Sequence, residues 1–132
     1  MAVSNEKGKV LLVDDDNFLL HMYSMKFSKD GYDVKTATSG KDAIAILKSG
    51  FAPNIMLMDL VMPVLDGFST YESMKRDGLT KDVCAIMLTN QGSAEDIAKA
   101  RELGFAGYIV KATTIPSEVV TEVIDIYKGF KK

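Results

Sequence analysis

The sequence predicts an α/β fold, namely one five-stranded parallel sheet, doubly wound, with helices on both faces. Two patterns predict this class. Short apolar runs alternate five times with longer stretches whose apolar residues recur at helical spacing. The apolar runs are continuous and lack polar alternation, which is typical of parallel strands that are buried on both faces.

The first half of the chain supplies three of the expected strands and two of the helices. The strands are predicted at residues 10–13, 32–38 and 55–58, and the helices at 17–30 and 39–48. Gly31 and Gly50 follow the helices as stop signals. Ser39 and Asp42 have the spacing of a capping box, which favours a helix start at Ser39.

The second half continues the same alternation. A loop with Pro63 and Asp66-Gly67 precedes a helix at about 68–76, and the fourth strand is predicted at 83–88. A helix from Ser93 to Gly104, a fifth strand at 106–110 and a last helix opened by Pro116 complete the pattern. With no linker or repeat visible, we expect residues 1–132 to form a single domain whose core spans about 9–128.

The composition of the chain indicates which kinds of partner it is unsuited to bind. The chain is 47% apolar and 26% charged with a net charge of −2, so no basic excess favours direct nucleic-acid binding. No signal-peptide stretch is visible, and no apolar run approaches the roughly 20 residues of a membrane span. The lone Cys84 lies in an apolar run and is predicted to be a core residue. We therefore expect a cytoplasmic protein with no membrane or direct nucleic-acid contact.

Polar residues stand where four of the predicted strands end. The first strand runs into Asp14-Asp15-Asp16, the third into Asp59, the fourth into Thr89-Asn90 and the fifth into Lys111. In an open parallel sheet, ligands bind at the carboxyl ends of the strands. These side chains are therefore expected to converge on one edge of the sheet.

The residue types that converge there have a chemical use in common. Clustered carboxylates repel one another, and Mg²⁺, which prefers oxygen ligands, relieves that repulsion. A carboxylate beside such an ion can attack a phosphoryl group and form an acyl phosphate. A lysine ammonium and a hydroxyl group can hold the charged phosphoryl oxygens during transfer. Asp14, Asp15, Asp59, Thr89 and Lys111 supply these groups.

Each of these residues taken alone has a simpler interpretation. Three aspartates after a strand are often a helix N-cap with favourable charge at the helix dipole. A single Thr or Lys at a strand end is usually solvated, and Asp59 alone could form a turn before Pro63. Only the joint placement, one polar group at each of four strand ends, favours a functional site.

With these residues in this order, the chain resembles the receiver domain of two-component response regulators over about residues 9–128. The resemblance depends on Leu11-Leu12-Val13-Asp14-Asp15, Met58-Asp59, Met62-Pro63 with Asp66-Gly67, Leu88-Thr89 and Tyr108 to Lys111, in this order and at these intervals. It implies a flavodoxin-like (βα)5 fold of the kind found in single receivers similar to CheY. It also implies a signalling phosphoacceptor domain rather than an enzyme, although one that assists its own phosphorylation and dephosphorylation.

The resemblance implies a role for each matching position. Asp59 would be the phosphoacceptor, and Lys111 would pair with the phosphoryl group. Asp15 would bind Mg²⁺ directly and Asp14 mainly through water, with Asp59 and the backbone carbonyl of Val61 as further ligands. The phosphoryl donor would be a histidine kinase or a histidine phosphotransfer protein.

The resemblance also implies a switch. Thr89 would bond a phosphoryl oxygen and Tyr108 would swing inward behind it. The altered surface, formed by the helix from Ser93, the fifth strand and the last helix, would bind a downstream protein. Ile115, Ile126 and Phe130 fall near or off the buried stripe of that last helix.

The chain differs from the usual family pattern at two positions, and its sequence leaves two other functions possible. Family members usually carry proline after the lysine, where this chain has Ala112, and a smaller residue than Asn90 after the threonine. A Mg²⁺-dependent phosphohydrolase also forms an aspartyl-phosphate, but it usually needs an acid two residues after the nucleophile, where Val61 stands. A receiver-like adaptor that acts without phosphorylation is the other alternative, and the complete set of polar residues disfavours it.

Overall fold

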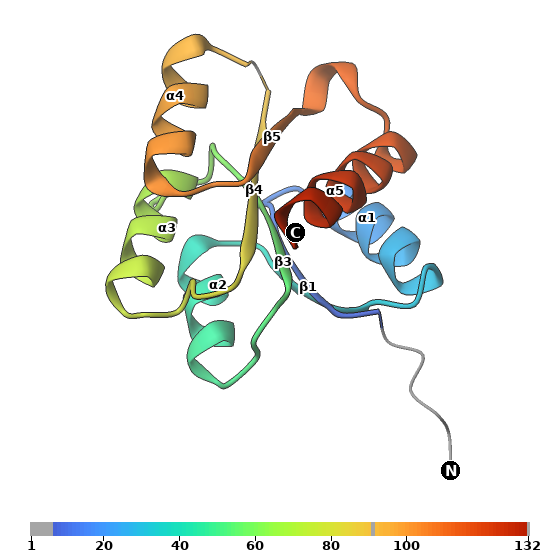
Figure 1. Ribbon diagram of the computed structural model, residues 1–132, viewed down its shortest axis with the longest axis horizontal. Helices are drawn as coiled ribbons and strands as arrows, with labels where there is room; N and C mark the ends of the chain where they lie inside the picture. The colour runs from blue at the N-terminus through green and yellow to red at the C-terminus, as the bar shows by residue number, and fades with distance from the viewer. Residues whose placement is uncertain (1–6, 91, 132) are drawn as a thin grey trace.

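The computed structural model describes residues 7–90 and 92–131, and in this part of the chain strands alternate with helices throughout (Figure 1). The strands are β1 (Lys9–Val13), β2 (Asp33–Ala37), β3 (Ile55–Asp59), β4 (Cys84–Thr89) and β5 (Gly107–Val110). The helices are α1 (Asn17–Lys29), α2 (Gly40–Lys48), α3 (Gly67–Arg76), α4 (Ala94–Leu103) and α5 (Pro116–Phe130), with a 3-10 turn η1 (Lys111–Thr113) after β5.

All neighbouring strands are parallel, in the order β2-β1-β3-β4-β5. The chain therefore winds outward from β1 in one direction and from β3 in the other, so the reversal of strand order lies between β1 and β3. Helices α1 and α5 cover one face of the sheet, and α2, α3 and α4 cover the other (Figure 1). This confirms the predicted doubly wound α/β class.

The two faces of the sheet have separate cores, because side chains alternate along each strand. Val10 and Leu12 of β1 pack with Phe27 of α1 and Val123 of α5, and all four are at most 1% exposed. Their neighbours on β1 join the opposite core. The central strands β1, β3 and β4 are covered on both faces, which is why their sequences are nearly continuous apolar runs, whereas two of the five residues of the edge strand β2 are exposed.

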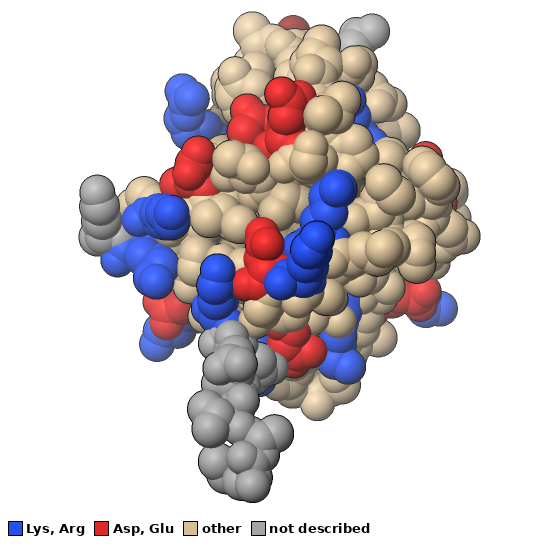
Figure 2. Space-filling view, turned by 90° about the vertical axis from the view of Figure 1, so that its right-hand side faces the viewer, with Lys and Arg blue, Asp and Glu red and all other residues tan. Residues whose placement is uncertain are grey.

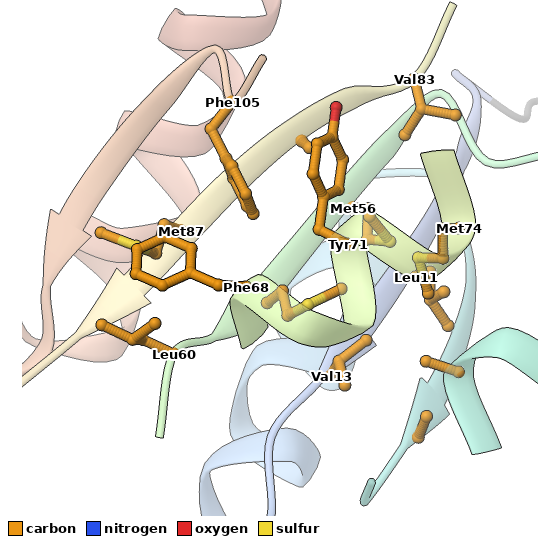
Figure 3. Packing of buried hydrophobic residues seen from close by; sticks show 14 of the residues in the cluster. Leu11, Val13, Met56, Leu60, Phe68, Tyr71, Met74, Val83, Met87 and Phe105 are labelled. Atoms are coloured by element: carbon orange, nitrogen blue, oxygen red, sulfur yellow. The ribbon is translucent and has the colours of Figure 1, made fainter. Parts of the chain in front are cut away.

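The core beneath α2, α3 and α4 is rich in aromatic and methionine side chains (Figure 3). Phe68 and Phe105 meet edge to face, with ring centroids 6.4 Å apart, and Tyr71 lies 4.4 Å from Phe105. Four methionines are at most 1% exposed, namely Met56, Met58, Met74 and Met87. Methionine suits such positions because its flexible side chain fills irregular gaps in a core.

Helices α2 and α4 each begin with a serine whose side chain caps the helix. The Ser39 and Ser93 hydroxyls accept the N–H groups of Asp42 and Asp96, each at 3.1 Å. The C-cap of α4 is Gly104 at φ 109°, a left-handed conformation that glycine adopts without steric cost. The helix starts and stops expected at these residues are confirmed.

Several strand ends differ by one residue from the predicted bounds, and two of these changes involve site residues. Strands β3 and β4 each end one residue later than predicted, so that Asp59 and Thr89 are the last strand residues rather than the first loop residues. Backbone pairing explains this, because Asp59 still pairs with Leu88 and Thr89 with Val110 in the ladder. These side chains are thus fixed by sheet geometry.

Three further features of the described residues concern Cys84, the bond after Lys111 and the length of the helices. Cys84 is 0% exposed, as predicted for a core residue. No cis peptide bond occurs in residues 7–90 and 92–131, so the Lys111–Ala112 bond is trans. No helix in these ranges has the length and apolar character needed to cross a membrane.

Candidate functional site

The three consecutive aspartates after β1 have different roles. Asp16 is the N-cap of α1, and its carboxylate accepts the N–H of Leu19 at 3.1 Å. Asp14 is only 2% exposed, and its Oδ1 accepts the N–H of Asp16 at 2.9 Å. Asp15 is exposed. The helix-cap interpretation therefore holds for Asp16 alone, which leaves Asp14 and Asp15 for the site.

Asp59 brings the third carboxylate to the same edge. It is 3% exposed, and its Oδ1 lies 3.4 Å from the backbone N–H of Val61. One carboxylate oxygen from each of Asp14, Asp15 and Asp59 lies within 4.8 Å of the other two. This acidic cluster sits between β1 and β3, where the strand order reverses and where ligands bind in sheets of this type.

Lys111 is the cation of the site. Its Nζ lies 2.8 Å from Oδ2 of Asp14 and 3.4 Å from Oδ2 of Asp59. Its side chain is 12% exposed, so the ion pairs are largely shielded from water. Lys111 opens the η1 turn directly after β5, and this turn carries its side chain across β4 to the carboxylates.

The electrostatics of Asp59 follow from this crowding. The pKa of the Asp59 carboxyl is raised to about 6, first by burial and then by the nearby Asp14 carboxylate, while the Lys111 ammonium opposes the rise. For Lys111, burial alone would lower the pKa, but the contacts with Asp14 and Asp59 outweigh burial and raise it. The cluster therefore carries more negative charge than one lysine compensates.

The donor set fits a hard divalent cation. Three carboxylates within reach of one point are oxygen ligands of the kind that Mg²⁺ prefers. Oδ2 of Asp14 is buried without an aligned hydrogen bond, and the Lys111 ammonium at 2.8 Å meets it as an ion pair. Buried carboxylate oxygens of this kind are usually satisfied by several donors or by a metal.

Thr89 and Tyr108 lie on neighbouring strands, as the register of β4 and β5 shows. Thr89 is 3% exposed at the end of β4 and pairs with Val110, two residues beyond Tyr108. Tyr108 is 40% exposed, so its side chain lies outward rather than in the core. The inward position expected of Tyr108 in a switched state is not the one that it occupies here.

A pocket opens over Asp59 at this edge of the sheet. Besides the charged residues, its walls are formed by Leu19, Val61, Asn90 and Ala112. Asn90 and Ala112, the two departures from the family pattern, therefore border the site itself. Both side chains are exposed.

Sequence reasoning thus named the residues that the fold brings together, but it missed two features of the site. It paired Lys111 with the phosphoryl group at Asp59 and gave no sign that Lys111 lies closer to Asp14. It also used Asp66-Gly67 only as a loop signal and as part of the family pattern, although Gly67 packs against the backbone of Asp59. Both depend on the fold rather than on local patterns.

Comparison with known families decides the classification. A sequence model of the response regulator receiver domain matches residues 10–123. The chain belongs to that family. It is a receiver domain of the two-component response regulators, and the resemblance drawn from the motifs is confirmed.

Relatives and solved structures agree with the assignment of this receiver domain. The chain is 32% identical over 127 residues to the probable transcriptional regulator ycf27 of Porphyridium aerugineum, covering 96% of this chain and 51% of that protein. It is 33% identical over 123 residues to the response regulator SaeR of Staphylococcus aureus, covering 93% and 52%. This receiver domain therefore spans about half the length of the curated relatives it matches.

The structural similarity covers most of the receiver domain. The chemotaxis response regulator CheY4 of Vibrio cholerae matches with a TM-score of 0.80 at 28% identity, covering 89% of this chain and 97% of that chain. The receiver domain of Francisella response regulator 1452 matches with a TM-score of 0.79 at 27% identity, covering 93% and 98%. At these TM-scores both response regulators share the overall fold of this chain.

Proposed function

We propose that Asp59 accepts a phosphoryl group from a phosphohistidine donor and that the resulting charge alters a protein-binding face. One observation carries this proposal. The buried carboxylate of Asp59, 3% exposed, ends a central strand beside two further carboxylates and one buried ammonium, and a pocket opens directly over it. Such a group is held in place, desolvated and reachable, which are the properties of a nucleophile.

The chain's own residues account for the steps of transfer. A carboxylate oxygen of Asp59 forms a bond to phosphorus while the phosphorus–nitrogen bond of the phosphohistidine breaks, and the imidazole nitrogen keeps the electron pair. The Lys111 ammonium, 3.4 Å from Asp59, can then hold one phosphoryl oxygen. The Thr89 hydroxyl, on the adjacent strand end, can donate to another.

Asp14, Asp15, Asp59 and the backbone carbonyl of Val61 would hold Mg²⁺. When bound, the ion neutralises the acidic cluster and stabilises the charge on the phosphoryl oxygens. The support is the oxygen donor set, with its three carboxylate oxygens within 4.8 Å of one another. One lysine shared between two of these carboxylates leaves a net negative site for a cation to occupy.

Exposed apolar side chains at the same edge support a protein donor, which we take to be a histidine kinase or a histidine phosphotransfer protein. Phe18 is 70% exposed at the start of α1, and Val61 and Val64 are exposed in the loop after β3. Ile115, the N-cap of α5, is 60% exposed. Apolar groups around a polar pocket favour contact with another protein over contact with water.

The proposed output surface is the face of α4, β5 and α5. A hollow there is lined by residues of all three elements, including Ile97, Tyr108, Glu122 and Ile126. An inward movement of Thr89 toward a phosphoryl group would vacate space beside β4, and Tyr108 is the bulky neighbour that could fill it. The outward, 40% exposed Tyr108 supports this as the unswitched position.

The alternatives have less support. A phosphohydrolase of the aspartyl-phosphate type usually has an acid two residues after the nucleophile, and Val61 in that position is apolar and 63% exposed. An adaptor that acts without phosphorylation has no need for a buried ion pair at the pocket.

Some relatives are named transcriptional regulators. Over the face drawn in Figure 2, however, lysine and arginine side chains are interspersed with aspartate and glutamate, which does not favour nucleic-acid contact there.

Phosphorylation by a small donor tests the acceptor directly. With Mg²⁺ and acetyl phosphate, intact mass spectrometry should show one phosphoryl adduct on the native protein and none on Asp59→Asn. Asp30→Asn, at the far end of α1, is the matched control and should be modified like the native protein. An undiminished adduct on Asp59→Asn would exclude Asp59 as the acceptor.

A further inference from the structure

Gly67, the first residue of α3, lies in close contact with the strand that carries Asp59. A Cβ atom at Gly67 would lie 2.6 Å from the carbonyl oxygen of Asp59 and 2.9 Å from the Cα of Leu60. Both are backbone atoms, so neither can rotate away as a flexible side chain would. Gly67 is not among the described glycines with positive φ, so close approach, not backbone conformation, requires a glycine here.

The same contact closes the loop between β3 and α3. The N–H of Gly67 donates to the carbonyl oxygen of Leu60 at 2.8 Å, and the N–H of Leu60 donates to Leu88 of β4 at 2.8 Å. Residue 60 is therefore held between the sheet on one side and the start of α3 on the other. The next residue is Val61, whose N–H lies 3.4 Å from the Asp59 carboxylate.

The first turn of α3 is itself fixed, so it can act as a support. The Asp66 carboxylate accepts the N–H of Ser69 at 2.8 Å, and the Asp66 carbonyl accepts both the N–H and the hydroxyl of Thr70 at 2.9 and 2.7 Å. Thr70 is 0% exposed. A turn held at this many points transmits a displacement at Gly67 to Leu60 rather than absorbing it.

We propose that Gly67 is a positioning residue for the phosphorylation site. By letting α3 approach the backbone of Asp59 and Leu60, it holds the Val61 backbone beside the Asp59 carboxylate, where both serve the same Mg²⁺. This role rests on the magnesium site proposed above. Gly67 itself touches neither the ion nor the phosphoryl group, and it acts only through residues 59–61.

Gly67→Ala tests the role, because the single added methyl group must displace the backbone of residues 59 and 60. We expect the metal-free variant to show altered amide NMR shifts at residues 59–61. We also expect Mg²⁺, titrated calorimetrically, to bind about tenfold or more weakly, the usual effect of losing a group that supports metal ligands. Gly129→Ala, on α5 with open space around its Cβ, is the matched control and should change neither.

A general loss of stability must be separated from mispositioning. Val123→Ala, in the core on the opposite face, should lower the melting temperature but keep the native Mg²⁺ dissociation constant. Should Gly67→Ala fail to fold, Asp66→Ala loosens the same turn by removing the cap on Ser69 without adding a clash. It should then show the weaker Mg²⁺ binding.

The two proposals can fail separately. If the native protein binds Mg²⁺ and a folded Gly67→Ala binds it equally well, the positioning role is overturned and the proposed function stands. An unchanged Mg²⁺ dissociation constant in Asp66→Ala would overturn it in the same way. If the native protein itself binds no Mg²⁺, both proposals are overturned.

Discussion

Lys111 and Asp14 form a buried ion pair, with Nζ and Oδ2 2.8 Å apart and side chains 12% and 3% exposed. Such a pair is costly to break from one side, because the remaining charge is left without compensation in a poorly solvated place. Here the remaining charges would be two, since Asp59 shares the same ammonium. The stability of the metal-free fold should therefore depend on Lys111.

Lys111→Met should lower the free energy of unfolding by about 3 kcal/mol in the absence of divalent cations. Urea denaturation in EDTA measures this. Lys48→Met is the control, because it removes an exposed ion pair, the contact of Lys48 with Asp77 at 3.5 Å. It should lower the free energy of unfolding by less than about 1 kcal/mol. Equal effects of the two substitutions would contradict the buried character of the Lys111 pair.

Mg²⁺ should raise the melting temperature of the native protein, because it binds the folded acidic cluster and not the unfolded chain. At a concentration about a hundred times the dissociation constant, binding adds about 2.7 kcal/mol of stability. Asp15→Asn should raise the melting temperature in EDTA by relieving repulsion, and it should reduce the Mg²⁺ response. If Mg²⁺ raised the melting temperature of Asp15→Asn as much as that of the native protein, Asp15 would not be a ligand. Asp30→Asn, which removes one negative charge elsewhere, is the control.

Thr89→Ala should separate phosphorylation from signalling. Asp59 keeps its carboxylate and Lys111 in this variant, so acetyl phosphate should still modify it. The amide NMR shifts that phosphorylation induces over α4, β5 and α5 should be much smaller than in the native protein, because residue 89 then lacks the hydroxyl that would follow the phosphoryl group, so phosphorylation no longer changes the space open to Tyr108 beside β4. Native-size shifts in Thr89→Ala would mean that the signal leaves the site by another route.

Cys84 should be unreactive in the folded protein. Its side chain is 0% exposed, and burial raises the pKa of its thiol to about 11, so both access and thiolate are lacking at pH 7.5. Iodoacetamide should modify it only on unfolding, at a rate that rises steeply with urea. Rapid modification in buffer, followed by mass spectrometry, would show that β4 opens locally.

The sequence predicted the fold well because the apolar runs of the strands and the caps of the helices are local signals. Ser93 and Gly104 bound α4 as expected, and both act through neighbours within a few residues. The last residues of β3 and β4 were not predictable in this way. Whether Asp59 and Thr89 belong to strands depends on their partners in the ladder, Leu88 and Val110, which are distant in sequence.

The candidate site was predictable as a set of residues but not as a geometry. Strand ends identify which side chains meet, since parallel strands share one carboxyl edge. They do not show that Asp16 turns away to cap α1 while Asp14 turns inward to Lys111. They also cannot show how closely α3 approaches Asp59, because the packing of Gly67 is decided by elements that meet only in the folded chain.

The parallel arrangement of the strands also separates two kinds of connection. Among the described residues, the segments leading from a strand into a helix lie at the carboxyl edge of the sheet, the edge that carries Asp59, while the segments leading from a helix into a strand lie at the opposite edge. The turn from Asp77 to Val83 is of the second kind, and a Cβ atom placed on Gly78 within it would meet no other atom within 4 Å. Peptide insertions should therefore be tolerated there without moving the site, which makes this turn the natural place to attach a reporter to the domain.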